Sequence, residues 1–171
     1  KYGRIGETLT FEFEIERCKV NPEWISIDDN DVGYDILSIY SNEYPSRKIC
    51  IETKTTSISK NIFYITKNEW NTSLYKNKED YKFYLWILDS YKLESDLLII
   101  DSHKLINDIP LNQGEGKWEN SSFHIRQINK SKYNKIVFDD FSNYMKKKIK
   151  QSIQLYLDNY SEDISKSNKG D

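Results

Sequence analysis

Apolar residues at the start of the chain recur at helical spacing. They form one stripe made of Ile5, Leu9, Phe11, Phe13 and Ile15. This stripe predicts a helix over residues 4–18, and the Glu, Arg and Leu residues between its members favour a helix as well. The run FEFEIE alternates strictly, so a strand over residues 9–16 is the alternative.

Two later segments alternate between apolar and polar residues with the period of a strand. Residues 34–40 and 48–54 have this pattern, and the intervening residues 41–47 are rich in turn formers. Together they predict a β-hairpin. Because side chains of a strand alternate between its faces, Ile49, Ile51 and Thr53 share one face, and Cys50, Glu52 and Lys54 share the other.

The rest of the chain predicts further strands, two turns and two helices. Strands are expected at 23–27, 61–66, 81–88, 96–101, 118–128 and 134–139, with turns at 28–31 and 112–117. A helix over 67–76 would be capped by Thr66 or Asn68. Another, amphipathic helix begins near residue 140, with a stripe of Phe141, Met145, Ile149, Ile153 and Leu157.

The order of these elements predicts the fold class. A helix, three strands, a helix and a strand give an α/β (α+β) core with a mixed sheet, as in a restriction-endonuclease-like fold, rather than a doubly wound one. The predicted division is a core over residues 1–90, a C-terminal extension over 91–160 that completes the same domain, and a flexible tail over 161–171.

Composition and charge exclude some classes of protein. The 171 residues suffice for one domain with a real core, and the net charge of -2 does not by itself favour nucleic acid. Cys18 and Cys50 lack metal-ligand spacing and are expected as reduced thiols. His103 and His124 are solitary and are expected to be structural or exposed. Because there is no apolar run near 18 residues, we expect neither a membrane span nor a membrane partner. We expect a cytoplasmic location.

Three acid-any-lysine triplets are present, and one of them stands out. The triplets are Glu52-Thr-Lys54, Asp80-Tyr-Lys82 and Glu115-Gly-Lys117. Only the first lies within an alternating strand, where both charges share a face. The predicted hairpin also places Asp35 near residue 53. Carboxylates so close repel each other unless a cation lies between them, and Mg²⁺ accepts a few carboxylates with water and phosphate. The alternative is a salt bridge on a solvated strand face.

The arrangement of these residues resembles the PD-(D/E)XK nuclease superfamily. Asp35 would be its motif aspartate and IETK (51–54) its (D/E)xK. RIGE (4–7) is similar to the first-helix motif of Holliday-junction resolvases and Mrr-like enzymes. The set GE (6–7), GYDI (33–36), IETKTT (51–56) and FYITKNEW (63–70) resembles the C-terminal domain of NO VEIN, which occurs in many bacterial defence and helicase proteins.

This resemblance implies an activity and a role for each residue. It implies a DNA endonuclease of a restriction or anti-phage system, in which Asp35, Glu52 and the Thr53 carbonyl hold Mg²⁺ or Mn²⁺, Lys54 acts on the water and Glu7 supplies a further acid. Lys67, Asn68, Glu69 and Thr55 would contact substrate, although a helix cap explains Asn68 and Glu69 equally well. The implied partners are DNA, ATPase or helicase domains of a larger defence protein, and a second copy in a homodimer.

Two other functions are compatible with the sequence. One is a nuclease-fold module that has lost cleavage and binds nucleic acid or a partner protein. The other is a protein-interaction domain without any nucleic-acid role. The lysines within residues 146–150 either form a solvated helix face or contact phosphates.

Overall fold

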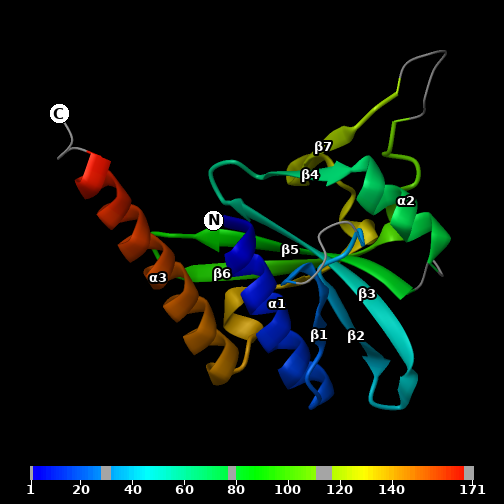
Figure 1. The fold of residues 1–171 in the computed structure, drawn as a ribbon, viewed down its shortest axis with the longest axis horizontal. Coiled ribbons are helices and arrows are strands. Elements are labelled where there is room, and N and C mark those ends of the chain that lie inside the picture. Colours follow the sequence, from blue (N-terminus) through cyan, green and yellow to red (C-terminus); the bar gives the residue numbers. More distant parts are fainter. Residues whose placement is uncertain (1, 28–31, 77–79, 111–116, 168–171) are drawn as a thin grey trace.

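The computed structural model describes residues 2–27, 32–76, 80–110 and 117–167 (Figure 1). In chain order its helices and strands are α1 (Tyr2–Cys18), β1 (Glu23–Trp24), β2 (Ile36–Ser41), β3 (Tyr44–Ser57), β4 (Ile62–Thr66), α2 (Lys67–Tyr75), β5 (Tyr81–Asp89), β6 (Glu94–Asp101), β7 (Asn120–His124), β8 (Tyr133–Ile136) and α3 (Asn143–Ser167). Short 3-10 turns follow β1, β6 and β7 and flank β8. The fold is α+β, as predicted, although four strands rather than three lie between α1 and α2.

The strands form two sheets. The larger has the order β1-β2-β3-β5-β6-β8, and only its β3–β5 pair is parallel. It is therefore the mixed sheet that the sequence predicts. β4 and β7 pair with each other in a separate antiparallel ribbon, which lies beside α2 at the top of Figure 1.

Helices cover both faces of the large sheet and divide the core in two. On one face, Ile5 and Leu9 of α1 and Met145 of α3 pack against Tyr84 and Trp86. On the other face, the buried residues are Phe63, Ile65, Trp70, Phe83, Leu85 and Phe123, from α2, the ribbon and the sheet. β6 and β8, beyond residue 90, extend the same sheet.

The alternating run FEFEIE is helical, and its acids have partners on two sides of α1. Lys148 donates to Glu12 (2.9 Å), and the Ser142 hydroxyl donates to Glu16 (2.5 Å), so these acids face α3. Glu14 faces the sheet and is fully buried. The predicted helix is therefore confirmed, and the strand alternative is wrong.

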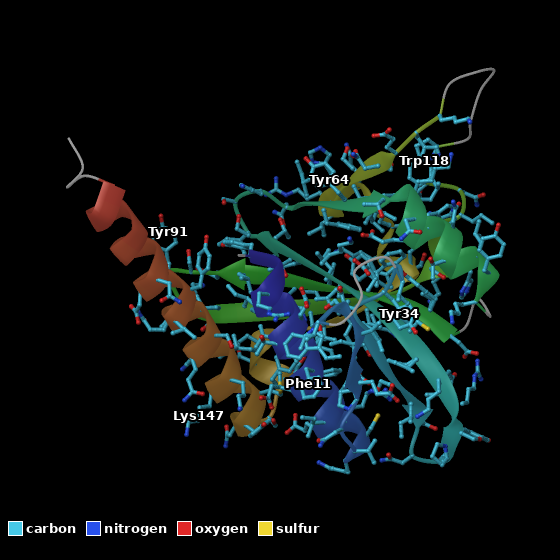
Figure 2. The ribbon with its side chains drawn as sticks, in the orientation of Figure 1. Phe11, Tyr34, Tyr64, Tyr91, Trp118 and Lys147 are labelled. Carbon is cyan, nitrogen blue, oxygen red and sulfur yellow. The ribbon has the colours of Figure 1, made fainter. Side chains whose placement is uncertain are left out.

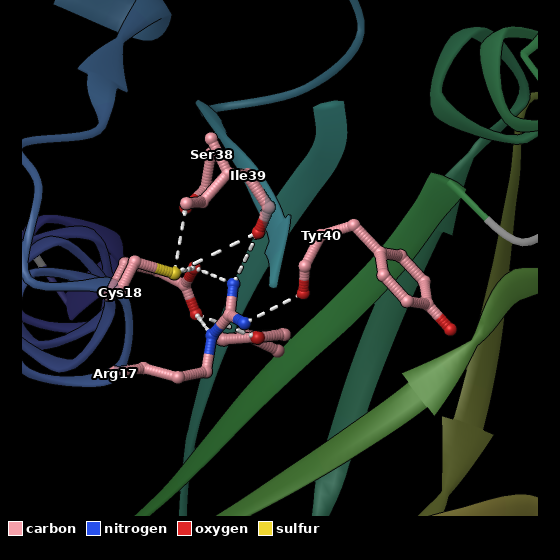
Figure 3. Close-up of polar contacts among 7 residues, drawn as sticks. Arg17, Cys18, Ser38, Ile39 and Tyr40 are labelled. Carbon is pink, nitrogen blue, oxygen red and sulfur yellow. Dashed lines mark hydrogen bonds and ion pairs between the residues drawn. The ribbon is translucent and has the colours of Figure 1, made fainter. Parts of the chain in front are cut away.

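Glu14 belongs to a buried cluster that fastens the end of α1 to β2 (Figure 3). It accepts hydrogen bonds from the Arg17 Nε (2.8 Å) and from the Tyr84 hydroxyl (2.8 Å). Arg17 also donates to the carbonyls of Tyr40 (2.9 Å) and Ile39 (2.7 Å), where the β2–β3 register shifts. Arg17 thereby supplies donors to backbone acceptors at an irregular point of the ladder.

Several predicted boundaries are wrong. The strand expected at 23–27 ends at Trp24, because the Asp35 carbonyl accepts from the amides of both Ile25 and Ser26 and turns the chain. β3 begins at Tyr44, inside the predicted turn. The strands expected at 118–128 and 134–139 are only Asn120–His124 and Tyr133–Ile136, each followed by a 3-10 turn.

Other predictions concern residues at the edge of what the structure describes. The predicted turn 28–31 and most of 112–117 lie outside the described residues. α3 continues to Ser167, into the segment expected to be a flexible tail, and residues 168–171 are outside the described residues. Cys18 and Cys50 are buried free thiols. Among the described helices, none is long and apolar enough to cross a membrane.

Candidate active site

Asp35 lies at the point where β2 and β3 separate. Ile36 pairs with Ile51, and the Asp35 amide donates to the Ile51 carbonyl (3.0 Å). The next rung is made by a side chain, since the Thr53 amide donates to the Asp35 carboxylate (2.8 Å). Beyond this point β3 pairs only with β5 among the described strands. One edge of β3 is therefore open next to Asp35.

Lys54 lies between two carboxylates that come from different elements. Its Nζ is 2.9 Å from Glu52 Oε1 and 2.8 Å from Glu69 Oε2. Glu52 and Lys54 share a face of β3, as predicted, and only 7% of the Glu52 surface is exposed. Lys54 thus joins the central strand to the first turn of α2.

Glu69 has two roles at once. The Thr66 hydroxyl accepts from the Glu69 amide (3.3 Å), and the Glu69 carboxylate accepts from the Thr66 amide (2.9 Å), which is a capping box. The same carboxylate contacts Lys54. The sequence presented a cap and a site residue as alternatives, and the structure shows that the cap aims Glu69 at the site.

The charges of this cluster are unbalanced. Burial raises the pKa of Asp35 to about 6, and the nearby carboxylates of Glu7 and Glu69 contribute to this rise. The hydrogen bond from the Thr53 amide and the charge of Lys54 act in the opposite direction. Burial also raises the pKa of Glu52, and the Asp35 carboxylate contributes. Burial works against the charge on Lys54, but Glu52 and Glu69 outweigh it and raise its pKa. Asp35 and Glu52 therefore share a site in which the ionised form of each carboxyl group is unfavourable.

The cavity beside these acids is small and polar. It has a volume of ≈ 240 Å³ and is lined by Ser26, Gly33, Tyr34, Asp35, Glu52, Thr66, Asn68 and Glu69. Gly33 has a φ of +82°, and a Cβ there would lie 2.3 Å from the Thr72 hydroxyl. The Tyr81 hydroxyl donates to its carbonyl (2.5 Å). Glycine is therefore required before Tyr34, whose side chain is labelled beside the site in Figure 2.

Glu7 lies near this cluster but has its own partners. Its carboxylate accepts hydrogen bonds from the indole of Trp24 (2.9 Å) and the hydroxyl of Ser26 (2.7 Å). The adjacent Gly6 allows α1 to approach β3 closely, because a Cβ there would lie 2.1 Å from the Thr55 hydroxyl. Glu7 therefore influences Asp35 through its charge while it braces α1 against β1.

Of the remaining predicted site residues, some lie at the cavity and others do not. Asn68 lines the cavity. The Thr53 side chain points to the opposite face and contacts the Thr10 hydroxyl (3.2 Å), so only its backbone belongs to the site. The Thr55 hydroxyl is buried without a hydrogen-bond partner, away from the cavity lining. Lys67 donates its amide to the Glu119 carbonyl (2.7 Å) at the start of α2.

The structure also adds residues that the sequence argument missed. Trp24, Ser26, Thr72 and Tyr81 hold Glu7 and Gly33 in place. Their positions gave no local signal, because each makes its contact across elements. The capping box from Thr66 to Glu69 was different, since its spacing is readable in the sequence.

The competing motifs have structural partners elsewhere. Asp80 contacts Arg47 (2.6 Å) and Lys82 contacts Asp101 (2.8 Å), and Glu115 lies outside the described residues. Among the described residues no group of three His, Cys, Asp or Glu side chains converges on a metal-sized position, so His103 and His124 form no such site.

The lysines of α3 also have local partners. Lys146 and Lys150 lie over the ring of Phe138, and Lys148 contacts Glu12. α3 packs with α1 on the face opposite the Glu52 side chain. These lysines are therefore remote from the acidic cavity.

Fold and site together define a class of protein. It is an α+β domain with a mixed sheet and a buried acid–acid–lysine cluster at a strand junction. The family model described as "Protein NO VEIN, C-terminal" matches residues 6–97, and the chain belongs to this family. The match includes every residue of the cluster. No curated protein and no solved structure matches the chain.

Proposed function

We propose that this chain is a metal-dependent DNA endonuclease domain of the PD-(D/E)XK type, working in a prokaryotic restriction or anti-phage system. One observation supports this most strongly. Asp35 and Glu52 line the same cavity, burial and nearby carboxylates raise the pKa of each, and Lys54 contacts Glu52 directly. A stability-driven design has no need for such an arrangement, because apolar residues would fill the space at lower cost.

The donors at this site fit Mg²⁺ or Mn²⁺. They are oxygens only, namely two carboxylates and the Thr53 carbonyl at the open strand edge. Mg²⁺ commonly uses one or two carboxylates and completes its octahedron with water and substrate phosphate. When bound, the cation would lower the pKa of a water and offset charge on the phosphate.

Lys54 would act as a hydrogen-bond donor in this reaction. Its raised pKa keeps the side chain protonated at neutral pH, so it cannot serve as a general base in this state. An ammonium beside the phosphate would orient the attacking water and stabilise the charge that develops. Glu52 and Glu69 hold this ammonium in position.

The remaining groups would set the geometry around the phosphate. Glu7 would support the acidic cluster through its charge on Asp35. Asn68 lines the cavity and would contact the DNA backbone. Two copies of this site would allow both strands to be cut together, so we propose a homodimer, with any ATP-driven step supplied by a separate ATPase or helicase domain.

A catalytically inactive binding module is the second candidate. It is supported by the double salt bridge of Lys54, since a lysine neutralised by Glu52 and Glu69 is less available to a phosphate. In that case DNA would bind without cleavage. The two candidates differ in whether the acidic cluster is needed for a chemical step.

A plasmid-nicking assay in Mg²⁺ and in Mn²⁺ tests the proposal. The wild-type chain is expected to nick supercoiled DNA, and Asp35→Ala and Lys54→Ala are each expected to slow nicking by about 10²–10³-fold, the usual cost of removing one charge-stabilising group. Lys82→Ala is the matched control. It removes a lysine from a second acid-x-Lys triplet, paired with Asp101 on the other face of the sheet.

The possible results separate the two candidates. Equal nicking by wild type and Lys82→Ala, with loss in the two site variants, supports the endonuclease. DNA binding without nicking in either metal supports the inactive module. Equal nicking by all four proteins would show that the activity lies elsewhere, and the proposal would fail.

A further inference from the structure

The ribbon of β4 and β7 has an outer face that the proposed cleavage chemistry does not use. Its inner side chains Phe63, Ile65 and Phe123 are buried in the core. Strand alternation places the other side chains on the outside, and they are Ile62, Tyr64, Thr66, Asn120, Ser122 and His124. Tyr64 pairs with Ser122 in the middle of this row. The outer face therefore presents an aromatic ring among hydrogen-bonding groups.

The two strands of the ribbon contain no Lys, Arg, Asp or Glu. The charged residues lie just beyond the strands, with Lys60 and Arg126 at one end and Lys67, Glu69 and Glu119 at the other. Exposed Lys60 and Arg126 flank the outer row at one end. These two exposed cations favour a polyanion as the partner of this end of the surface.

The ribbon is also directly connected to the candidate active site. β4 ends at Thr66, which caps α2 and fixes Glu69 against Lys54. A second cavity, of ≈ 510 Å³, is lined by Lys54, by Lys60 just before β4 and by Tyr64 of the ribbon. Figure 2 labels Tyr64 on the ribbon. A DNA strand at Lys54 would therefore continue along the ribbon.

We propose that the outer face of the β4–β7 ribbon enters the major groove of DNA and contacts base edges. This proposal rests on the proposed endonuclease function and names how its substrate is held. The major groove of B-DNA is about 12 Å wide and admits a two-stranded β-ribbon. Asn120 matches the donor and acceptor of adenine, and Ser122 pairs with several bases. Tyr64 gives an apolar contact, and Lys60 and Arg126 contact phosphates.

The shape of the groove distinguishes DNA from RNA. The major groove of A-form RNA is deep and narrow, and side chains do not enter it. The ribbon is therefore expected to prefer a DNA duplex over an RNA duplex of the same sequence. Lysines alone would show no such preference, because phosphates are common to both.

The test is a sequence selection from a pool of randomised DNA duplexes in a buffer with a metal chelator, so that binding is measured without cleavage. The wild-type chain is expected to enrich a short motif. The double variant Tyr64→Ala/Asn120→Ala is expected to bind that motif about 10- to 100-fold more weakly and to lose the preference. Lys60→Ala is expected to weaken all sequences equally and to lower the salt slope by about 1.

Matched controls come from the far side of the molecule. Tyr91 is 95% exposed in the turn between β5 and β6, and Lys147 is exposed on α3 (Figure 2). Tyr91→Ala and Lys147→Ala are expected to bind and select DNA like the wild type. Thermal melting of every variant checks that it is folded.

Each result decides the proposal. Loss of motif preference only in the ribbon variant, with weaker binding to RNA duplexes, supports it. A motif that the ribbon variant still selects would overturn it and leave the endonuclease proposal standing. Uniform binding of all DNA and RNA duplexes by the wild type would also overturn it. Nicking of plasmid without any effect of the ribbon variants would place the DNA on another surface.

Discussion

Two buried ionic clusters lie near the two ends of α1, and they differ in how well their charges are matched. Glu14, in the second half of the helix, meets a bidentate Arg17 and the Tyr84 hydroxyl, and Arg17 donates its other hydrogen bonds to carbonyls of β2 (Figure 3). At the other end, near Glu7, Lys54 is shared by Glu52 and Glu69, with Asp35 close by.

The difference separates structural roles from chemical ones. A buried carboxylate whose acceptors are all used holds elements together and has no capacity left for a ligand. A cluster with more acids than cations has raised carboxyl pKa values and favours any added cation. Burial alone therefore does not distinguish the candidate active site from the Glu14 cluster. The distinguishing feature is an excess of acids over cations at an open strand edge.

The largest expected effect comes from breaking the matched cluster. Glu14→Ala leaves the half-buried Arg17 without its carboxylate and removes the acceptor of the buried Tyr84 hydroxyl, so the free energy of unfolding should fall by about 3 kcal/mol in a urea titration. Glu16→Ala is the control on the same helix, because its exposed carboxylate contacts only Ser142 among the described side chains. Equal losses in both variants would mean that the Glu14 cluster is not what fastens α1.

A smaller effect of opposite sign is expected at the unmatched cluster. Burial raises the pKa of Asp35 from 3.8 to about 6, so its contribution to stability is fully present below pH 3.8 and is lost as the pH rises through about 6. Without metal, Asp35→Asn should therefore raise the free energy of unfolding at pH 8 by about 1–3 kcal/mol, since one pKa unit corresponds to about 1.4 kcal/mol. Asparagine keeps an acceptor for the Thr53 amide.

Thermal melting over pH 4–8, with and without Mg²⁺, measures this effect. In the wild type, Mg²⁺ should raise the melting temperature more at pH 8 than at pH 5, because only the ionised carboxylate attracts the cation. In Asp35→Asn the metal effect should be small at both values. Parallel pH curves for the two proteins would contradict the assignment of Asp35 to the unmatched cluster.

The smallest expected effect concerns the link between α2 and the unmatched cluster. Thr66→Ala removes the side-chain cap of α2 and should lower the free energy of unfolding by about 1 kcal/mol in denaturant melts. Thr66→Ser keeps the hydroxyl and should have little effect. If both variants melt alike, the cap does not stabilise the helix that aims Glu69 at Lys54.

Part of the site was predictable because its signals are local. Alternation along β3 placed Glu52 and Lys54 on one face, and the hairpin placed Asp35 at their end. The capping spacing of Thr66 and Glu69 was readable in the same way. These features depend on the period of a strand and on the first turn of a helix, which neighbouring residues determine.

Other features could not be predicted, because they join distant segments. The pairing of β4 with β7 brings together residues far apart in the chain, and nothing within residues 61–66 separates a ribbon strand from a sheet strand. Likewise, the inward orientation of Glu14 depends on Arg17, which also contacts β2, and on Tyr84 of β5.

The amino-acid sequence by itself determined a helix over residues 4–18, the central hairpin, the mixed α+β class and the trio of Asp35, Glu52 and Lys54, since each follows from short-range periodicity and order. Only the tertiary structure decided that Glu69 shares Lys54, that Glu7 is held by Trp24 and that the β4–β7 ribbon stands beside the cavity. The physical reason is that burial and charge balance depend on which distant side chains meet, and a local pattern does not specify that.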